Sequence, residues 1–415
     1  MASGRKLLFL SPCMPSLYGA GPAQRAFHTL RILSEAFEVH LLVVGIKDRG
    51  RKKPAPPEAA KERVKVIPVD PWRDLVFLGR RTLQIAAPLW SERWLPIPSE
   101  WCCASRRVVA ATAEQYRGVS FDTIHVFRLC MEPFAAPYRA ANPGSQMQLD
   151  LDEIESLTRR RLARLYGLNG QTRKARRWEV DARVCERAER DVLPAYDRVL
   201  VSSERERLGL CEMFQNLEVT VVPNVVAVPP APHRARNGGG PFVILFLGHL
   251  AYYPNADAVA WFAQRVLGLV RRKADRDVRF DVAGPGASRG QISRWKRVEG
   301  LRVVGPVERV DECYDSADAV VVPIRAGGGT RIKILEAFAR QTPVVTTSVG
   351  MEGIDVTAGE HLLVGDTPED HARACLELIA DPDLAHRLTD HAFAVWKRSY
   401  QPHAMRAGLL GAGRT

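Results

Sequence analysis

Short apolar runs alternate with longer amphipathic segments along almost the whole chain, and this alternation restricts the fold more than any other feature. Runs such as Lys6–Leu10 and Phe242–Leu247 are bounded by turn residues and followed by segments of helical period. Strands that alternate with helices pair in parallel, because each parallel connection needs a crossover. The pattern therefore predicts an α/β fold built on doubly wound parallel sheets.

The expected strands fall into two groups. The first group is Lys6–Leu10, Val39–Val44, Val64–Val69, Thr123–Phe127, Gln146–Leu151, Arg198–Val201 and Val219–Val222. The second group is Phe242–Leu247, Arg279–Ala283, Leu301–Val304, Ala319–Val322, Val344–Thr347 and His361–Val364. Each group is large enough for a sheet of its own.

A segment rich in proline and glycine, Pro229–Pro241, separates the two groups and has no apolar period. We expect a domain over residues 1–228, a linker over 229–241 and a second domain over 242–395. The tail, 396–415, is expected to cross back to the first domain. A length of 415 residues suits two domains better than one.

Composition excludes several classes of protein. With 46% hydrophobic and 26% charged residues the chain is globular, and no apolar stretch is long enough for a signal-peptide core or a membrane span. The eight cysteines show neither metal-ligand nor disulfide spacing. They indicate a reducing compartment, so we expect a cytoplasmic protein, with peripheral contact to the inner membrane face as an alternative.

The net charge of +12 is concentrated in one region. Residues 159–190 hold eleven Lys or Arg and four Asp or Glu, in a stretch of helical pattern. A solvated helical face explains this charge, and a patch for an anionic membrane or acceptor is the alternative. No aromatic-rich or helix-turn-helix pattern accompanies it, so a nucleic-acid partner is not expected.

Three consecutive glycines, Gly327–Gly329, follow the expected strand Ala319–Val322 and precede a helical pattern that we expect to begin near Thr330 as N-cap. Backbone amides in such a loop approach a bulky anion, and the helix N-terminus adds partial positive charge. Arg331 and Lys333 then lie in the first helical turn, where cations are unfavourable unless an anion is bound. These features predict an anion site.

Glu336 lies one turn further on, where it is placed to accept hydrogen bonds from vicinal hydroxyls. The alternative is a plain loop in which Glu336 pairs with Lys333 at the surface. The Gly-x-x-x-x-Gly-Lys-Ser/Thr pattern is absent from this segment, so ATP hydrolysis is not indicated.

An ordered set of further segments accompanies this loop along nearly the whole chain. They are Tyr18–Arg25, Val221–Asn224, Phe246–Gly248, Val282–Gly284, Val304–Val307, and Thr342–Val345 with Val349–Gly350. Together with the glycine-to-glutamate segment, they resemble retaining GT-B glycosyltransferases of family 4, which include sucrose synthases and many mannosyl- and glucosyltransferases.

The resemblance implies two Rossmann-like domains that face each other across a cleft. It implies transfer of a hexose from a nucleotide diphosphate sugar to an acceptor hydroxyl, with retention of anomeric configuration, no cofactor and no dedicated metal. The first domain is then the acceptor side and the second binds the donor. The base (UDP, GDP or dTDP) and the acceptor (a glycan, a lipid-linked molecule or a small aglycone) stay open. In a front-face reaction the leaving diphosphate takes the acceptor's proton, so the protein mainly positions groups and stabilises charge.

The resemblance also implies site residues. Those expected to bind the donor are Gly248, His249, Gly284, Val307, Gly327, Gly328, Gly329, Thr330, Arg331, Lys333 and Glu336. The cleft glycine loop is Gly19 and Gly21, and the expected catalytic residues are Arg331, Lys333 and Arg128. Acceptor candidates are His125, Asp150 and Asp152, with a core histidine and solvated loop acids as the alternatives.

Two departures from the family pattern are plain. Family members carry two glutamates around this loop, but here Gly328 occupies the first position. The usual Arg and Lys after the first strand of the second domain are replaced by His249 and Tyr252 or Tyr253, so we expect Arg331 and Lys333 to substitute. Two further hypotheses stay open: a sugar-nucleotide epimerase or hydrolase, since fold does not fix function, and a protein that binds a sugar nucleotide without catalysis.

Overall fold

The computed structural model describes residues 4–17, 19–46, 55–70, 74–86, 97–227 and 240–411. Two compact units make up the chain: Met1–Pro223 with Met405–Thr415, and Asn224–Ala404. Only the last two positions of the expected linker, 229–241, lie within the described residues. Of the expected tail, 396–404 stays with the second unit, and the end of the chain belongs to the first.

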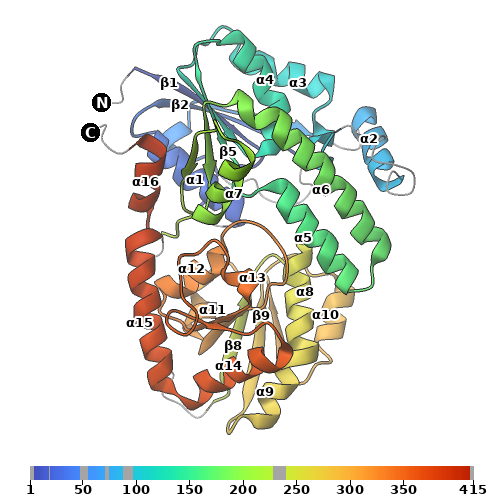
Figure 1. The fold of residues 1–415 in the computed structure, drawn as a ribbon, viewed down its shortest axis with the longest axis vertical. Helices are drawn as coiled ribbons and strands as arrows, with labels where there is room; N and C mark the ends of the chain where they lie inside the picture. The colour runs from blue at the N-terminus through green and yellow to red at the C-terminus, as the bar shows by residue number, and fades with distance from the viewer. Residues whose placement is uncertain are drawn as a thin grey trace. The chain divides into compact units, whose positions relative to one another are not determined.

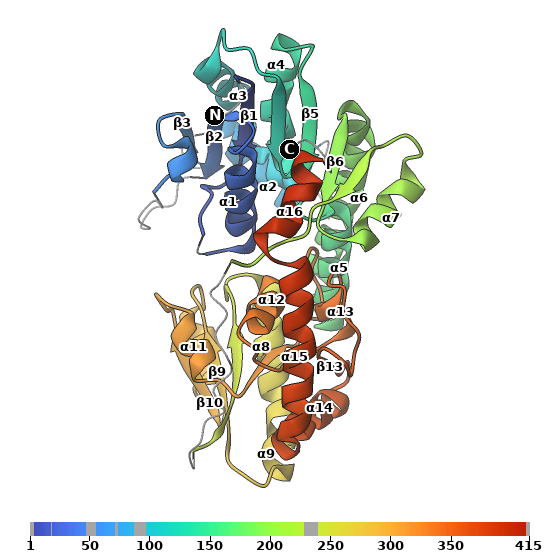
Figure 2. The same cartoon turned by 90° about the vertical axis from the view of Figure 1, so that its left-hand side faces the viewer.

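The first unit is built on a seven-stranded parallel sheet in the order β3-β2-β1-β4-β5-β6-β7. Its strands are β1 Lys6–Ser11, β2 Glu38–Ile46, β3 Val64–Val69, β4 Thr123–Phe127, β5 Gln146–Asp150, β6 Arg198–Val201 and β7 Val219–Val221. Leu7 to Leu10 of β1 are completely buried. Helices cover both faces of the sheet, which explains why the residues of its central strands β1 and β4 are almost all buried (Figure 1, Figure 2).

The helices of the first unit are α1 Gly21–Leu33, α2 Leu75–Ala86, α3 Arg106–Ala113, α4 Glu132–Ala141, α5 Glu155–Leu168, α6 Thr172–Val192 and α7 Glu204–Met213. Short 3-10 turns are η1 Glu58–Ala60, η4 Ser99–Cys103, η5 Glu114–Tyr116, η6 Leu129–Met131 and η7 Leu193–Ala195. Helices α5 and α6 form a hairpin whose two helices lie side by side in both views (Figure 1, Figure 2).

The last helix, α16 (Pro402–Leu410), packs against the β6 and β7 edge of the first sheet. The Arg198 guanidinium donates to the carbonyl oxygens of Gly408 and Leu409, the second at 3.3 Å. A Cβ at Gly408 would approach the Val221 carbonyl oxygen to 2.7 Å, so only glycine allows this close approach.

The second unit has a six-stranded parallel sheet in the order β10-β9-β8-β11-β12-β13. Its strands are β8 Phe242–Leu247, β9 Val278–Ala283, β10 Leu301–Gly305, β11 Ala319–Val322, β12 Val344–Thr346 and β13 Leu363–Val364. Its helices are α8 Tyr253–Trp261, the π-helical turn η8 Phe262–Val266, α9 Leu267–Lys273, α10 Arg289–Trp295, α11 Asp311–Asp315, α12 Ile332–Ala339, α13 Ser348–Met351, α14 Pro368–Ala380 and α15 Pro382–Ser399.

When each sheet is numbered from its own first strand, the first six strands have the same order in both, and the first sheet adds β7 at its edge. The order reverses between β1 and β4 in the first unit and between β8 and β11 in the second. In doubly wound folds ligands bind at the carboxyl ends of the strands that flank this switch point. The topology therefore predicts ligand sites at the loops that follow β1 and β4 in the first unit and β8 and β11 in the second.

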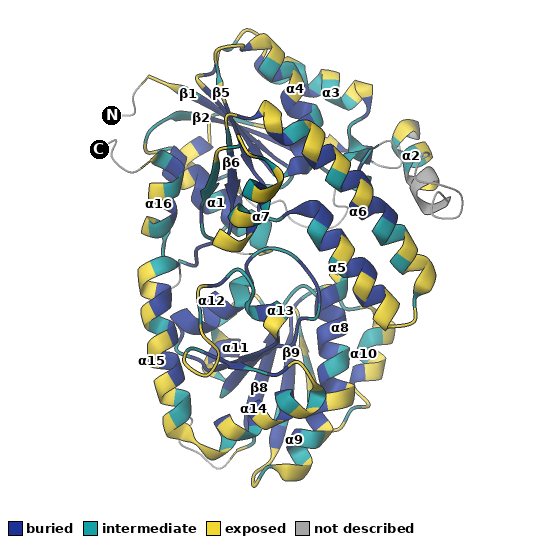
Figure 3. Ribbon diagram, in the orientation of Figure 1, coloured by how far each residue is buried: buried dark blue, intermediate teal, exposed yellow. Residues whose placement is uncertain are grey.

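The prediction of two Rossmann-like parallel sheets is confirmed. Each expected strand is present; β2 extends one residue before and two residues beyond the predicted Val39–Val44, and the last strand, predicted to begin at His361, begins at Leu363. Buried residues, dark blue in Figure 3, fill the space between the sheets and their helices. No helix among the described residues has the length and apolarity that crossing a membrane requires.

Candidate functional site

The switch point of the second unit is formed by the loops that follow β8 and β11. The first leads into α8 and the second, which contains Gly327–Gly329, into α12. Neither helix has a side-chain bond capping its N-terminus, at Tyr252 or at Arg331. Two helix N-termini, both with partial positive charge, thus begin at this edge of the sheet.

Glycines give these loops shapes that other residues rarely adopt. Gly327 and Gly329 have φ of 135° and 65°. After β9, Gly284 has φ of 131°, and a Cβ there would collide with the Gly248 carbonyl oxygen. The glycines thus allow the backbone to pass close to itself at the end of the sheet.

Lys333 brings a cationic side chain to the end of β8. Its ammonium donates a hydrogen bond of 2.8 Å to Oδ1 of Asn255 and lies 4.3 Å from the centre of the Phe246 ring. A Cβ at Gly248 would stand 2.9 Å from the same nitrogen. No carboxylate in the described part of the chain forms an ion pair with it. Desolvation and the charge of Arg331 lower the pKa of Lys333 to about 7.

Arg331 folds back over the glycine loop. Its guanidinium donates to the carbonyl oxygens of Gly328 and Gly329, the second at 2.8 Å. The helix begins at Ile332, with Arg331 in the N-cap position, so the prediction of Thr330 as N-cap is wrong. The Thr330 hydroxyl instead donates to the Gly353 carbonyl oxygen at 3.4 Å, a tertiary contact that the local sequence does not reveal.

Glu336 lies on the buried face of α12, with 8% of its surface exposed. The Tyr314 hydroxyl donates to Oε2 of Glu336 at 3.0 Å, and Arg340 stacks over the Tyr314 ring. Burial, with the adjacent Glu336 carboxylate, raises the pKa of Tyr314 well above its usual value. The alternative of a surface pair between Glu336 and Lys333 is therefore wrong, because α12 buries this carboxylate against α11.

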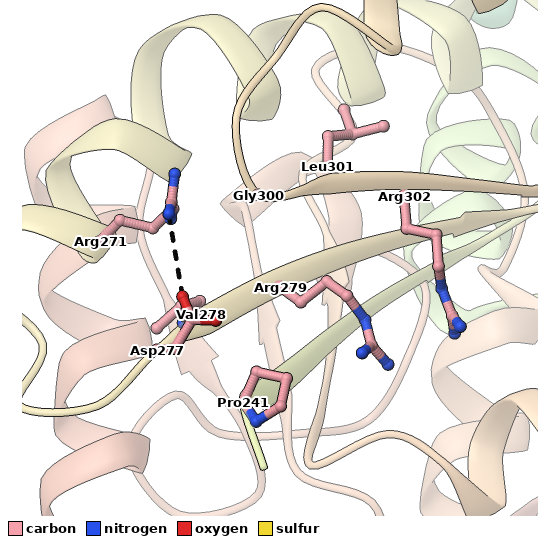
Figure 4. Close-up of a pocket in the computed structure, with 8 residues that line it drawn as sticks. All are labelled: Pro241, Arg271, Asp277, Val278, Arg279, Gly300, Leu301 and Arg302. Atoms are coloured by element: carbon pink, nitrogen blue, oxygen red, sulfur yellow. Dashed lines mark hydrogen bonds and ion pairs between the residues drawn. The ribbon is translucent and has the colours of Figure 1, made fainter.

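A cavity of about 330 Å³ lies at the opposite edge of the same sheet, where β8, β9 and β10 begin (Figure 4). Its cations are already neutralised: Arg271 pairs with Glu299 at 3.0 Å, and Arg279 and Arg302 both bond Asp281. The amino ends of parallel strands are also the wrong edge for a ligand site in this fold. This cavity is not the candidate site.

At the switch point of the first unit, the two arginines Arg25 and Arg128 are each paired with carboxylates. Arg25 of α1 holds Asp150, at the end of β5, through Nε at 2.9 and 3.0 Å and through Nη2 at 2.8 Å. Both side chains are fully buried, and Nη1 of Arg25 also donates to the Val222 carbonyl oxygen at 2.8 Å. Asp150, an acceptor candidate in the sequence, is instead the counter-ion of Arg25, which corrects that expectation.

Arg128 follows β4 with φ of 70°, a conformation uncommon for a residue with a side chain. Its Nη2 pairs with Glu153 at 2.7 Å and with Glu155 at 2.8 Å. Arg159 extends the network by binding Glu155 and, at 2.7 Å, Asp181. The guanidinium of Arg128 is thus already paired with two carboxylates. Its expected catalytic role stays a prediction.

His125 and Asp152 complete this region. His125 is fully buried in β4 and stacks on Phe9 with ring centres 4.7 Å apart, and burial lowers its pKa to about 4. It is a core histidine, which corrects its expectation as an acceptor residue. Asp152 follows β5 with φ of 60°, and burial raises its pKa to about 7.

The two glycines of the expected cleft loop lie at the start of α1. Gly19, with φ of 124°, precedes the helix, and Gly21 is its first residue. Tyr18 lies outside the described residues.

Comparison with known proteins bears on the second unit in particular. Residues 241–381 match the family model described as glycosyl transferases group 1. This match covers 141 of the 415 residues. An uncharacterized 44.6 kDa protein from the cps region of Klebsiella pneumoniae is 27% identical over 131 residues, 30% of this chain. That match spans only about a third, 33%, of the Klebsiella protein.

Solved structures show that the whole chain has the GT-B fold of such enzymes. Sucrose-phosphate synthase of Thermosynechococcus elongatus aligns with a TM-score of 0.67 at 14% identity, covering 97% of this chain and 96% of its own. HepE of Anabaena, solved with UDP and glucose, gives 0.62 at 14% identity, with 98% of both chains covered. TarM of S. aureus gives 0.64 at 12% identity, covering 98% and 99%.

Within residues 241–381, which match this family model, the structure brings Gly248, Lys333 and the glycine loop Gly327–Gly329 together around the β8/β11 switch point. His249 lies beside Gly286, and its carbonyl oxygen accepts a bond of 2.9 Å from Asn255. Val307 lies after β10, which β9 separates from β8. Asn255 and Tyr314 were not predicted from the sequence; the signal for Asn255 is a polar residue in the first turn of the helix that follows Gly248. No group of three His, Cys, Asp or Glu suited to a metal occurs in the described ranges.

Proposed function

We propose that the protein transfers a hexose from a nucleotide diphosphate sugar to an acceptor hydroxyl, and that the donor diphosphate binds at the β8/β11 switch point. The observation that carries this proposal is the ammonium of Lys333, which has a neutral amide as its polar partner, beside two helix N-termini and a glycine loop. A site with positive charge and no carboxylate counter-ion suits a polyanion.

Each part of the donor has a matching group in this proposal. The diphosphate lies against the loops at Gly248 and Gly327–Gly329, with Lys333 as counter-ion. Glu336, oriented by Tyr314, accepts hydrogen bonds from the ribose hydroxyls. HepE and TarM, which share the fold, were solved with UDP. Their example makes UDP the first base to test.

For the reaction, we propose transfer with retention through a front-face mechanism without a resident metal. The bond from the anomeric carbon to the diphosphate oxygen breaks, the acceptor oxygen bonds to that carbon, and its proton passes to the departing diphosphate. Lys333, the helix N-termini and the loop amides stabilise the charge that develops on the leaving group. The protein contributes mainly position and charge.

Binding and product analysis test the proposal. Titration with UDP-, GDP- and dTDP-sugars is expected to give saturable binding for one base, and incubation with an acceptor panel a new glycoside whose anomeric configuration, measured by NMR, matches the donor. EDTA is expected to leave the rate unchanged. An altered or free sugar would favour an epimerase or hydrolase, and binding without turnover would favour a binding protein. Absence of binding by all three nucleotide sugars would contradict the proposal.

We further propose a cytoplasmic protein that meets an anionic membrane surface through the tip of the α5–α6 hairpin. Between Arg159 and Trp178 the sequence holds eight Lys or Arg and no Asp or Glu. Leu168, at the turn, has 67% of its surface exposed. The Tyr166 and Trp178 rings stack 6.4 Å apart nearby, and the exposed outer surface of the hairpin is yellow in Figure 3. Cations around an apolar and aromatic tip suit a lipid interface.

Vesicle flotation tests this contact. The protein is expected to float with phosphatidylglycerol vesicles and not with phosphatidylcholine vesicles, and to detach as salt is raised. Arg173→Glu with Lys174→Glu should abolish flotation, whereas Arg272→Glu with Lys273→Glu, at the end of α9, serves as a matched control and should not. Equal binding to both vesicles, or equal loss in the control, would contradict membrane contact through this tip.

A further inference from the structure

Lys333 is an unusual counter-ion because its environment in the unliganded protein opposes its own charge. The ammonium donates a hydrogen bond to Asn255 Oδ1 and makes a cation–π contact with the face of the Phe246 ring. One neutral amide and one aromatic ring replace little of the water that a charged ammonium loses. An ion held this way either loses its proton or acquires an anion.

The charged groups around Lys333 reinforce this conflict. Arg331, two residues before it, repels the ammonium, while Glu336, on the same helix, attracts it but is engaged by Tyr314 of α11. On α8, Asp257 is paired with Arg325 at 2.7 Å and so does not serve as the counter-ion. The neighbouring loop presents the backbone carbonyl of His249 to Asn255 rather than to Lys333. The N-termini of α8 and α12 add positive potential.

We infer, resting on the proposed donor site, that donor binding is coupled to proton uptake at Lys333 Nζ. Without the donor, the amine is largely neutral at the alkaline end of the physiological range. The diphosphate brings two negative charges to it, a proton from the solvent converts it to the ammonium, and the proton returns to the solvent when the diphosphate leaves. The strength of donor binding therefore depends on pH through Lys333.

The size of the effect follows from the protonation of Lys333. Because burial lowers its pKa to about 7, the free protein holds about half a proton there at pH 7 and about a tenth at pH 8. Donor binding should then take up about 0.5 proton at pH 7 and about 0.9 at pH 8, and affinity should fall about fivefold between these values. Below about pH 6 both quantities should level off.

Isothermal titration calorimetry with UDP-glucose and GDP-mannose in buffers of different ionisation enthalpy measures the proton count directly. The diphosphate of a nucleotide sugar is a diester that does not titrate between about pH 6 and 8.5, so any uptake belongs to the protein. Lys333→Arg, which stays charged, should bind with no uptake and with a flat pH profile. Lys333→Gln should bind about tenfold or more weakly, again with a flat profile.

Lys296→Gln provides the control, because Lys296 is an exposed lysine of the same unit; it should keep the uptake and the pH profile of the wild type. Wild-type binding without uptake, or uptake that persists in Lys333→Arg, would overturn the coupling while leaving the donor site in place. If the wild-type protein binds none of the UDP-, GDP- and dTDP-sugars at any pH, it is the proposed function that is wrong, so the two failures are distinguishable.

Discussion

The two units share one topology, but the charges at their switch points are arranged in opposite ways. In the first unit, Arg25 is matched by Asp150 and Arg128 by Glu153 and Glu155, all as buried or half-buried ion pairs. In the second, the ammonium of Lys333 has a neutral partner and two helix N-termini beside it. The shared topology shows where a ligand is able to bind in each unit, at the carboxyl ends of the strands that flank the switch point. A cationic side chain without a carboxylate partner then indicates which of the two switch points suits an anion.

The largest expected effect on stability is at the switch point of the first unit, where Arg25 is paired with Asp150. Replacing Arg25 by Met leaves Asp150 as a buried charge without its counter-ion, so we expect the free energy of unfolding to fall by roughly 3–5 kcal/mol. Denaturant unfolding followed by circular dichroism measures it. Arg31→Met, on an exposed face of the same helix, is the control and should change little. A loss below about 1 kcal/mol in the Arg25 variant would break the comparison.

In the second unit, removing the charged side chain Lys333 is expected to increase stability rather than to decrease it. Because the pKa of Lys333 is lowered from 10.5 to about 7, the folded state binds fewer protons than the unfolded chain between these values. Stability of the unliganded protein therefore rises with pH through that window and is lowest below pH 7. Lys333→Met should remove this slope and raise the free energy of unfolding by about 1–3 kcal/mol near pH 6. Thermal unfolding of wild type and variant across this range checks it; a variant less stable at every pH would contradict the argument.

A smaller effect, on donor affinity, is expected from substitutions of Glu336 and of Tyr314, whose hydroxyl donates a hydrogen bond to Glu336. Glu336→Gln keeps an oxygen acceptor but loses the charge, so we expect about tenfold weaker nucleotide-sugar binding with the fold intact. Tyr314→Phe removes the hydroxyl that orients Glu336 and should weaken binding by about threefold. Calorimetry with the donor found in the base screen provides the measurement. Unchanged affinity in Glu336→Gln would contradict the proposal that Glu336 binds the ribose hydroxyls.

The smallest expected effect concerns Asp152. Burial raises its pKa from 3.8 to about 7, so the stability it contributes in the protonated form is present below pH 3.8 and is lost as pH rises through 7. Asp152→Asn stays neutral and tolerates the φ of 60°, so it should equal wild type in stability near pH 3.5 and should be about 1 kcal/mol more stable near pH 8. Paired denaturant curves at the two pH values measure this, and a loss of stability at pH 8 would show that the carboxylate is needed as a counter-ion for Arg128.

The sequence predicted the fold well because its evidence is local. Apolar runs such as Leu7–Leu10 are buried on both sides in a parallel sheet, so their positions can be recognised one strand at a time. The glycine loop before Lys333 was recognised for the same reason. Its consequence, an ammonium held at the end of β8, depends on Asn255, 78 residues away in the sequence.

The errors also have a physical cause. Asp150 and His125 follow or occupy strands in the way that site residues do, and only tertiary packing places Arg25, 125 residues away, on one and the Phe9 ring on the other. Thr330 is a good N-cap residue by type, but its hydroxyl bonds the Gly353 carbonyl oxygen instead. Long-range pairing of this kind leaves no mark in local patterns.

The return of α16 to the first unit has a practical consequence for protein engineering. Neither unit is one continuous stretch of chain, because the first consists of Met1–Pro223 together with Met405–Thr415. A fragment that stops at Pro223 would leave Arg198 without the carbonyl oxygens of Gly408 and Leu409 and would uncover the edge strand β7. Producing the first unit alone therefore calls for grafting the helix back through a short peptide after β7, and domain exchange with other GT-B proteins should carry α16 along with the unit that it completes.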